Sequence, residues 1–355
     1  MTIIFFIFFI GCLSIIFICT DFYFSLKTWS NRIHIGRWKN RTEWQKAMNR
    51  KAQDWLRHTP TVKIKDSKRL VLWDIICKKY QSNAIQSWQI AGLLLGVEPQ
   101  KPDIYDKLNK KLSDQNIIYP DQVLLAYTLK KKNVLSTENE HKILSFLNKY
   151  QSSTIPYRDH LPNIRFVDTI GMVCPFLNLC GKENIATRQI KEFDEILLNH
   201  IFPPHAYNLN NKLPLGIYDW SRGLGWYILG ITEASYSEEN EKRVIKLAES
   251  LLPLQQEGGG FGCMYFNKTT RFESSGSALI GLLFIKAYTI TKSEKYKIAA
   301  FAVEKALMKA TQRNGAVDYS QGDTKGIGFY STEFSTMPFT LGITLYLSTE
   351  LNKYV

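Results

Sequence analysis

The 355-residue sequence lacks several patterns, and each absence excludes a class of protein. Runs of alternating polar and apolar residues, which predict strands, are missing, so a fold built on sheets is not expected. The six cysteines show neither the spacing of a disulfide framework nor a CxxC motif. The composition is 45% hydrophobic and 22% charged, as in ordinary globular domains, so disorder is expected only at short ends.

Charged side chains are absent from residues 1–20, and this uncharged segment predicts a membrane anchor. Residues 3–19 are mostly Ile and Phe, and about 20 apolar residues span the ~30 Å hydrocarbon core of a bilayer. An aromatic cluster that includes Phe22, Tyr23, Phe24 and Trp29 follows, as at membrane interfaces. The alternative is a cleaved signal peptide, which needs a positive first segment and a small-residue cleavage site. Neither is present, so we expect a single-pass, uncleaved anchor at residues 1–24 that contacts lipid through residues 3–24.

Most of the net charge of +13 lies directly after this anchor. Residues 25–70 hold 13 Lys and Arg against 3 Asp and Glu, a net charge of +10, and residues 25–40 form a basic and aromatic juxtamembrane segment. A basic block beside an anchor suits anionic lipid head groups, and no nucleic-acid motif accompanies it, so nucleic acid is not an expected partner. Because no basic residue precedes the apolar span, the positive-inside bias predicts a cytoplasmic domain. Buried thiols at Cys77, Cys174, Cys180 and Cys263 would agree with a reducing compartment.

The remaining residues, 41–355, predict pairs of helices. Residues 279–287 are apolar on all faces, which is typical of a buried helix, whereas residues 296–307 place apolar side chains on one face and lysines on the other. Similar pairs are expected within residues 123–147, 166–197 and 223–251, and they start about every 50 residues. A buried helix that alternates with a surface helix favours two concentric rings, an all-α (α/α) barrel. An open solenoid is the alternative.

Polar and aromatic residues that could take part in binding or catalysis lie at the starts of the apolar helices. They are Asp121, Asp168, the segment 220–226 (WSRGLGW) and the segment 273–276 (ESSG). If the inner helices run parallel, these groups meet at one rim, where carboxylates, an arginine and tryptophan faces would form a sugar site. Aromatic rings stack on sugars, and arginine can pair with a uronate carboxylate through two parallel hydrogen bonds.

A structural role competes with the functional one at each position. Asp121 and the 273–275 segment could simply cap helices. Asp168 is harder to explain in this way because it lies in an apolar stretch, where a buried carboxylate is costly unless partners or a shifted pKa compensate.

The aromatic and histidine positions have structural alternatives too. Trp220 and Trp226 could be core residues, although Gly223 and Gly225 beside them suggest a segment that approaches something closely. His205 alone would be an ordinary loop histidine.

At these residues the sequence resembles a known family. The run 165–169 (RFVDT), followed by Met172 and by 175–177 (PFL), is similar to the VDT…PFL motif of the unsaturated glucuronyl and rhamnogalacturonyl hydrolases, glycoside hydrolase families 88 and 105. The 205–207 turn (HAY), the tryptophan-rich segment 220–226 and the segment 273–278 (ESSGSA) follow in the family's order. The likeness covers roughly residues 40–350 and implies a six-hairpin (α/α)6 barrel, preceded here by the N-terminal transmembrane helix.

The resemblance also implies a reaction. In this family an aspartate protonates the C4=C5 enol ether of a terminal unsaturated uronic acid, water adds at C5, and the hemiketal opens to release the neighbouring sugar. Asp168 would be the general acid and base, and Asp121 matches the second aspartate; a raised pKa would let a partly buried aspartate carry the proton. No metal and no organic cofactor are implied. The residues expected to bind the acidic oligo- or polysaccharide are His205, Trp220, Arg222, Trp226, Glu273 and Ser275.

Two residues depart from the family pattern. Asn208 stands where the family usually has Asp, and Leu224 stands where it often has Asn. Both lie in the expected binding region, so the substrate and the survival of catalysis stay open. A non-catalytic glycan-binding or assembly component of a surface-polysaccharide system is therefore an alternative. A sugar epimerase is a weaker one, because its proton shuttle needs paired histidines and His205 alone lies in the motifs. No obligate protein partner can be identified.

Overall fold

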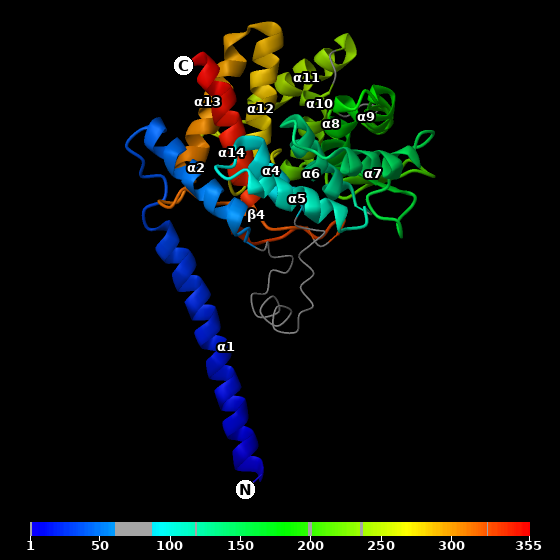
Figure 1. The fold of residues 1–355 in the computed structure, drawn as a ribbon. Coiled ribbons are helices and arrows are strands. Elements are labelled where there is room, and N and C mark those ends of the chain that lie inside the picture. Colours follow the sequence, from blue (N-terminus) through cyan, green and yellow to red (C-terminus); the bar gives the residue numbers. More distant parts are fainter. Residues whose placement is uncertain (1, 61–86, 118, 198–200, 235–236, 325) are drawn as a thin grey trace.

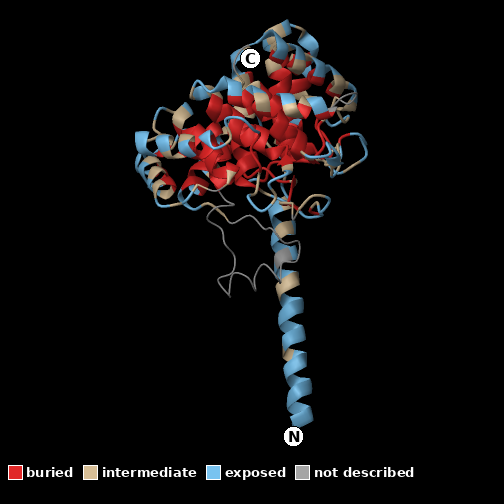
Figure 2. Cartoon of the chain, turned by 90° about the vertical axis from the view of Figure 1, so that its right-hand side faces the viewer, coloured by how far each residue is buried: buried red, intermediate tan, exposed pale blue. Residues whose placement is uncertain are grey.

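The structure of the protein is a computed structural model that describes residues 2–60, 87–117, 119–197, 201–234, 237–324 and 326–355. Figure 1 shows a helical domain from which one long N-terminal helix, α1 (Thr2–Arg32), projects. Figure 2 shows that buried residues fill the interior of the helical domain, whereas α1 is exposed over most of its length.

Within the described residues, six helices form a closed inner ring. Each helix packs against the next one in chain order, and the last packs against the first. A Cβ on Gly342 would overlap the carbonyl of Gly92, so only glycine allows the last and first helices to approach this closely. The closure excludes the open solenoid. The inner helices are α4 (Ser87–Gly96), α6 (Pro120–Lys131), α8 (Asp168–Leu179), α10 (Ser221–Thr232), α12 (Ser274–Thr291) and α14 (Pro338–Leu351).

A second set of helices surrounds this ring. The sequence pattern is confirmed in α12 and α13, since α12 is buried on nearly all sides and α13 buries one face that includes Tyr296, Val303 and Leu307. Serine caps start two of the outer helices: Ser136 accepts from the Asn139 amide and Ser237 from the Asn240 amide. The outer helices are α2 (Arg41–Arg57), α5 (Asp103–Ser113), α7 (Thr137–Asn148), α9 (Glu183–Leu197), α11 (Glu238–Leu251) and α13 (Glu294–Lys309). Two 3-10 turns, Leu252–Leu254 and Asn352–Tyr354, follow α11 and α14.

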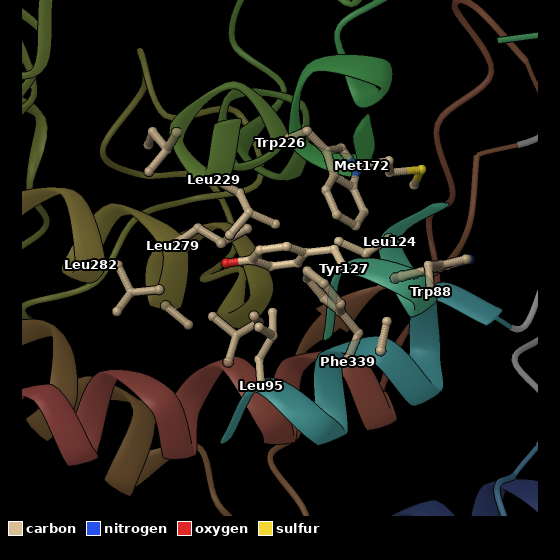
Figure 3. Packing of buried hydrophobic residues seen from close by; sticks show 14 of the residues in the cluster. Trp88, Leu95, Leu124, Tyr127, Met172, Trp226, Leu229, Leu279, Leu282 and Phe339 are labelled. Carbon is tan, nitrogen blue, oxygen red and sulfur yellow. The ribbon is translucent and has the colours of Figure 1, made fainter. Parts of the chain in front are cut away.

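Side chains fill the centre of the ring. Trp88, Trp226 and Phe339 come from three inner helices, and their rings pack at centroid distances of 4.8 to 5.7 Å (Figure 3). Aromatic pairs in such arrangements each contribute about 1 kcal/mol beyond the area they bury. The barrel is therefore a packed core with no open lumen between these helices.

The described part of the chain also contains five strands of two or three residues, which the sequence did not predict. They are too short to produce an alternating pattern. β1, β2 and β3 form an antiparallel sheet in which Phe166 lies opposite Ala206, and β4 pairs with β5, Gln321 lying opposite Phe334. The strands are β1 (Ile164–Phe166), β2 (Ala206–Asn208), β3 (Pro214–Leu215), β4 (Ser320–Gln321) and β5 (Phe334–Ser335).

α1 is joined to the barrel at its C-terminal end. Arg32 donates through Nε and Nη2 to the two carboxylate oxygens of Asp318, at 2.8 and 2.7 Å, and through Nη2 to the carbonyl of Phe334 at 2.8 Å. The Gly36 amide donates to the Thr311 carbonyl at 2.9 Å. Among the described residues, α1 is the one helix whose length and composition would let it cross a membrane, and a signal sequence would fit the same description.

The cysteine prediction is only partly correct. Cys174 is buried in α8, but Cys180 and Cys263 are partly exposed because the first ends α8 and the second lies in a loop before α12. Cys77 lies outside the described residues.

Candidate active site

The starts of the inner helices meet at one rim of the barrel, as the sequence predicted. The Ser320 hydroxyl bridges the first turns of α12 and α14, because it lies 2.9 Å from the Ser274 hydroxyl and donates to Thr340 Oγ1 at 2.7 Å. The Phe339 amide of α14 donates to Gln89 Oε1 of α4 at 2.9 Å. Inner helices with neighbouring first turns run parallel, so residues at these positions share one rim.

Buried oxygens without a hydrogen-bond partner concentrate at this rim. Of the six such side-chain oxygens among the described residues, five belong to the first or second residue of an inner helix, and the sixth is Thr344 Oγ1 in α14. Each unpaired buried polar atom costs about 1–3 kcal/mol, so a cluster of them indicates a place where ordered water or a bound ligand supplies the missing bonds. The five are Ser87 Oγ, Asp121 Oδ2, Asp168 Oδ2, Thr169 Oγ1 and Ser221 Oγ.

Two of these oxygens belong to the carboxyl groups predicted to carry the chemistry. Asp121 is the second residue of α6 and is 2% exposed, whereas Asp168 is the first residue of α8 and is 8% exposed. Burial raises the pKa of each carboxyl to about 7; the Arg158 charge opposes this shift, and the Asp323 charge adds to it. Both carboxyl groups can therefore hold a proton near neutral pH.

Helix capping does not explain Asp121. The residue that caps the start of α6 is Tyr119, whose amide donates to the Gln122 side chain at 3.1 Å. Asp121 Oδ2 is left without a partner. Asp121 is therefore not the N-cap residue of α6, although its carboxyl accepts a hydrogen bond from its own amide in the first turn.

His205 faces Asp168 with a neutral ring. The Tyr330 hydroxyl oxygen accepts from the Ile217 amide at 3.2 Å and lies 3.0 Å from His205 Nδ1, and we assign the Tyr330 hydroxyl as the donor to Nδ1 of the neutral ring. The ring hydrogen then lies on Nε2, which is 3.7 Å from Asp168 Oδ2. Burial, followed by the Arg222 charge, lowers the pKa of His205 to about 3. The contact with Asp168 is therefore that of a neutral N–H group and not an ion pair.

Arg222 is buried beneath the rim, and each terminal nitrogen of its guanidinium donates one hydrogen bond to a backbone carbonyl. Nη1 donates to the Gln321 carbonyl at 2.5 Å and Nη2 to the Gly322 carbonyl at 2.8 Å. Burial raises the pKa of Asp168 and Asp323, and the Arg222 charge lowers it in both. In this structure Arg222 thus holds the chain after β4 and supplies a positive field; direct contact with a sugar carboxylate stays a prediction.

The two tryptophans have different surroundings. The Trp220 ring packs against His205 and Tyr330, with centroid distances of 4.5 and 5.5 Å, and its Nε1 donates to Gln321 Oε1 at 3.2 Å. Trp226 packs against Phe339 in the ring centre (Figure 3). Trp220 therefore lies at the site, whereas the contacts of Trp226 are those of a core residue.

Glu273 and Ser275 have the contacts of a helix cap. Glu273 is fully buried and accepts from the amides of Ser275 at 3.1 Å, Gly276 at 2.6 Å and Gln321 at 3.1 Å. The Ser275 hydroxyl donates to Glu273 Oε1 at 2.6 Å. The capping alternative describes this pair, and sugar binding by it stays a prediction.

The sequence did not identify three polar residues at the site. Arg158 stacks over the rings of Tyr119 and Tyr157, 4.5 and 4.0 Å from their centroids. Asp323 follows β4, and Tyr330 orients His205. All three lie in loops, where charged and aromatic residues are common, so no periodic pattern distinguishes them.

The two departures from the family pattern have local explanations. Asn208 Oδ1 accepts from the Asn210 amide at 2.9 Å, and the Asn208 amide donates to the Leu213 carbonyl, so Asn208 shapes the turn between β2 and β3. Leu224 is buried in α10. Within the described residues, no group of three or more His, Cys, Asp or Glu side chains is arranged to hold a metal ion.

The sequence of residues 215–355 matches the family model of Glycosyl Hydrolase Family 88. This part includes Arg222 and Glu273, whereas Asp121, Asp168 and His205 precede it. A search of curated protein sequences finds no match to the chain.

The fold extends the likeness to most of the chain. A possible member of the GH105 family from Klebsiella pneumoniae is 15% identical, with a TM-score of 0.63 over 89% of this chain and 94% of that one. An unsaturated glucuronyl hydrolase from Bacillus sp. GL1, described as responsible for glycosaminoglycan degradation, is also 15% identical, with a TM-score of 0.62 over 88% and 97%. A family 105 glycoside hydrolase from C. acetobutylicum is 17% identical, with a TM-score of 0.58 over 81% and 100%.

The structural likeness shows a shared α/α toroid, and the family match adds the class of enzyme, a glycoside hydrolase. The resemblance to families 88 and 105 predicted from the sequence is therefore confirmed.

Proposed function

We propose that the protein is a membrane-anchored glycoside hydrolase that removes an unsaturated uronic acid from the end of an acidic saccharide. The observation that carries this proposal is Asp168. Its carboxyl lies at the rim, its Oδ2 has no hydrogen-bond partner, and its pKa is raised by burial to about 7. Such a group can give up and regain a proton at neutral pH.

In the proposed reaction, protonated Asp168 gives its proton to C4 of the C4=C5 double bond. A water molecule adds its oxygen at C5, and its released proton returns to Asp168. The hemiketal formed at C5 then opens, and the neighbouring sugar leaves. One water is consumed, and Asp168 ends the cycle in its starting protonation state. Asp121 would supply the second carboxyl group of the site, and burial raises the pKa of this carboxyl to about 7 as well.

Recognition of an acidic sugar is supported by the charges around Asp168. The terminal nitrogens of Arg222 already bind backbone carbonyls. Arg158 stacks on two tyrosines and its Nη1 binds the Tyr157 carbonyl at 3.1 Å, which leaves further N–H groups of its guanidinium for a uronate carboxylate. We therefore assign Arg158, together with Trp220 and His205, to sugar binding.

The anchor is part of the proposal. Apolar side chains along α1, from Ile3 to Ile18, are largely exposed, and an apolar surface of this length is unfavourable in water. Residues 1–24 would cross the bilayer, residues 25–40 would lie beside it, and residues 41–355 would form the barrel on the cytoplasmic side.

The direct test uses an unsaturated uronyl disaccharide, whose double bond is conjugated to the carboxylate and absorbs in the ultraviolet. The wild-type protein should remove this absorbance, and Asp168→Asn should lower the rate by about 10²–10⁴-fold, the usual contribution of general acid catalysis. Asp159→Asn, at an exposed loop position, is the matched control and should keep the wild-type rate. A wild-type protein that binds the disaccharide and leaves its absorbance unchanged would favour the non-catalytic glycan-binding function.

A further inference from the structure

α1 leaves the barrel at the rim that carries the candidate site. Its last residue, Arg32, binds Asp318, two residues before β4, and the carbonyl of Phe334 in β5. In the same pair, Gln321 accepts hydrogen bonds from Trp220 and Arg222. Figure 1 shows α1 extending away from the side of the barrel on which β4 lies. A bilayer that contains α1 therefore lies on the side of the rim.

Exposed apolar side chains gather on loops of this rim. Phe329 is 71% exposed and precedes Tyr330, which bonds to His205. Met264 is exposed and pairs through its backbone with Trp220, and Phe266 is exposed two residues further along the loop. Large exposed apolar side chains on loops around a polar site suit contact with a lipid surface.

Positive charge accompanies them. Arg271 is exposed and stacks 4.3 Å over the Phe334 ring, beside the attachment of α1. Lys309 is also exposed, and its backbone touches Gly36 just after α1. Both line a cavity of about 260 Å³ that also includes Tyr319. No acidic partner is recorded for Arg271 or Lys309 among the described residues, so both are available to anionic head groups.

The length of α1 sets the distance between the rim and the lipid. Asp21 is the first charged residue, and the 11 residues from there to Arg32 rise about 16 Å at 1.5 Å per residue. Head groups and the interface occupy about 5–8 Å of this distance. The remaining distance, about 10 Å at Arg32, is the depth within which the rim loops approach the head groups, and it would admit a short saccharide that projects from the membrane more readily than a long coiled polymer.

We propose that the rim of the barrel faces the bilayer that holds α1, and that the saccharide cleaved there is joined to a membrane lipid. The first part stands on the attachment of α1 and on the apolar and basic rim. The second part rests on the proposed hydrolase activity, because it names the carrier of that substrate.

The orientation can be measured on the full-length protein in vesicles that contain anionic phospholipid. A fluorescent amino acid is placed at Phe329 and, as the matched control, at Ile298, which is 66% exposed near the start of α13 at the opposite end of the barrel. Lipids with a nitroxide on the head group should quench the probe at 329 severalfold more than the probe at 298. Equal quenching at the two positions, or stronger quenching at 298, would overturn the orientation.

The substrate is tested by presenting one unsaturated uronyl disaccharide in two forms to the same vesicles, free or coupled to a lipid through its reducing end. We expect the lipid-coupled form to be hydrolysed at least tenfold faster at equal concentration, and detergent to remove this preference. Phe329→Ser should slow hydrolysis of the coupled form alone, and Ile298→Ser should slow neither.

The outcomes separate the two proposals. Hydrolysis of the free form with no gain for the coupled form would overturn the lipid-linked substrate and leave the hydrolase activity standing. Failure to hydrolyse either form would overturn the proposed activity, and the lipid-linked substrate with it, whereas the quenching result would still decide the orientation.

Discussion

Asp121 and Asp168 keep their protons at a pH at which most carboxyl groups have lost theirs. The cause is burial at the start of a helix, where the charged form has lost most of its water and one oxygen has no partner. Arg158 and Asp323 act on both groups in opposite directions. The proton affinity of the site therefore depends on these two loop residues in addition to burial and, for Asp168, on the Arg222 charge.

This arrangement predicts the pH profile of kcat/KM. Because the proton donor must be protonated, activity should be constant below about pH 7 and fall about tenfold per pH unit above it. Asp323→Asn removes a charge that raises the pKa of Asp168, so the falling limb should move to lower pH; Arg158→Gln should move it to higher pH. Movement of both variants in the same direction would contradict the assignment of Asp168 as proton donor.

His205 makes a second prediction at this scale. Burial lowers its pKa to about 3, so the ring should stay neutral, with its hydrogen on Nε2, from pH 5 to pH 8. Imidazole nitrogen chemical shifts measure both properties, and His205→Gln assigns the signal. A titration midpoint between pH 5 and pH 8 would show that the ring becomes charged.

The residues that we propose for the centre of the site could be named from the sequence, whereas their neighbours could not. Asp168 stood out because a carboxylate within an apolar stretch needs a reason, and its place on the rim followed from its position at a helix start. Arg158, Asp323 and Tyr330 were not found because a loop residue shows its partners only after the chain has folded. For Glu273, the residue type alone favoured capping and the family resemblance favoured binding, and its four hydrogen bonds show a cap.

At the scale of the element, the start of α12 depends on Glu273. Glu273→Ala would leave three amides without their acceptor, and it should lower the free energy of unfolding by about 3 kcal/mol in urea titrations. Glu294→Ala, in the exposed first turn of α13, is the control and should cost less than about 0.5 kcal/mol. If Glu273→Ala instead keeps its stability and raises KM, Glu273 binds sugar.

The elements themselves were predictable to different degrees. Helices α6 to α13 were expected because a pattern that is apolar all round, followed by one with a single apolar face, extends over many residues in each pair. The strands were missed because two or three residues cannot show a period. Yet these strands position the site, since β1 leads into Asp168 and β2 follows His205.

At the scale of the whole molecule, the anchor and its side of the membrane can be checked together. The full-length protein should stay in the membrane pellet after alkaline carbonate extraction, since about 20 apolar residues cross the bilayer. In intact cells, external protease should leave the barrel undigested, because the basic residues after α1 favour a cytoplasmic domain. Release by carbonate would indicate a cleaved or peripheral segment, and digestion from outside would place the barrel on the other side.

The ring itself was expected from alternation of helix types, which suggested two layers. Its closure depends on contacts between α14 and α4, at opposite ends of the sequence, and no local pattern reveals these. The sequence also did not predict on which side of the barrel α1 attaches. This position follows from the Arg32–Asp318 pair, whose members lie 286 positions apart.

The aromatic packing of Trp88, Trp226 and Phe339 has a consequence for how substrate enters the site and how product leaves it. These side chains close the centre of the toroid beneath the carboxyl groups. A saccharide that enters at the rim therefore cannot pass through to the other side of the barrel. A chain cannot be threaded through the ring, and whatever is cut off must leave by the mouth through which the substrate came. Substrate and product therefore use the same opening, and the product of one turnover must leave before the next chain end can bind.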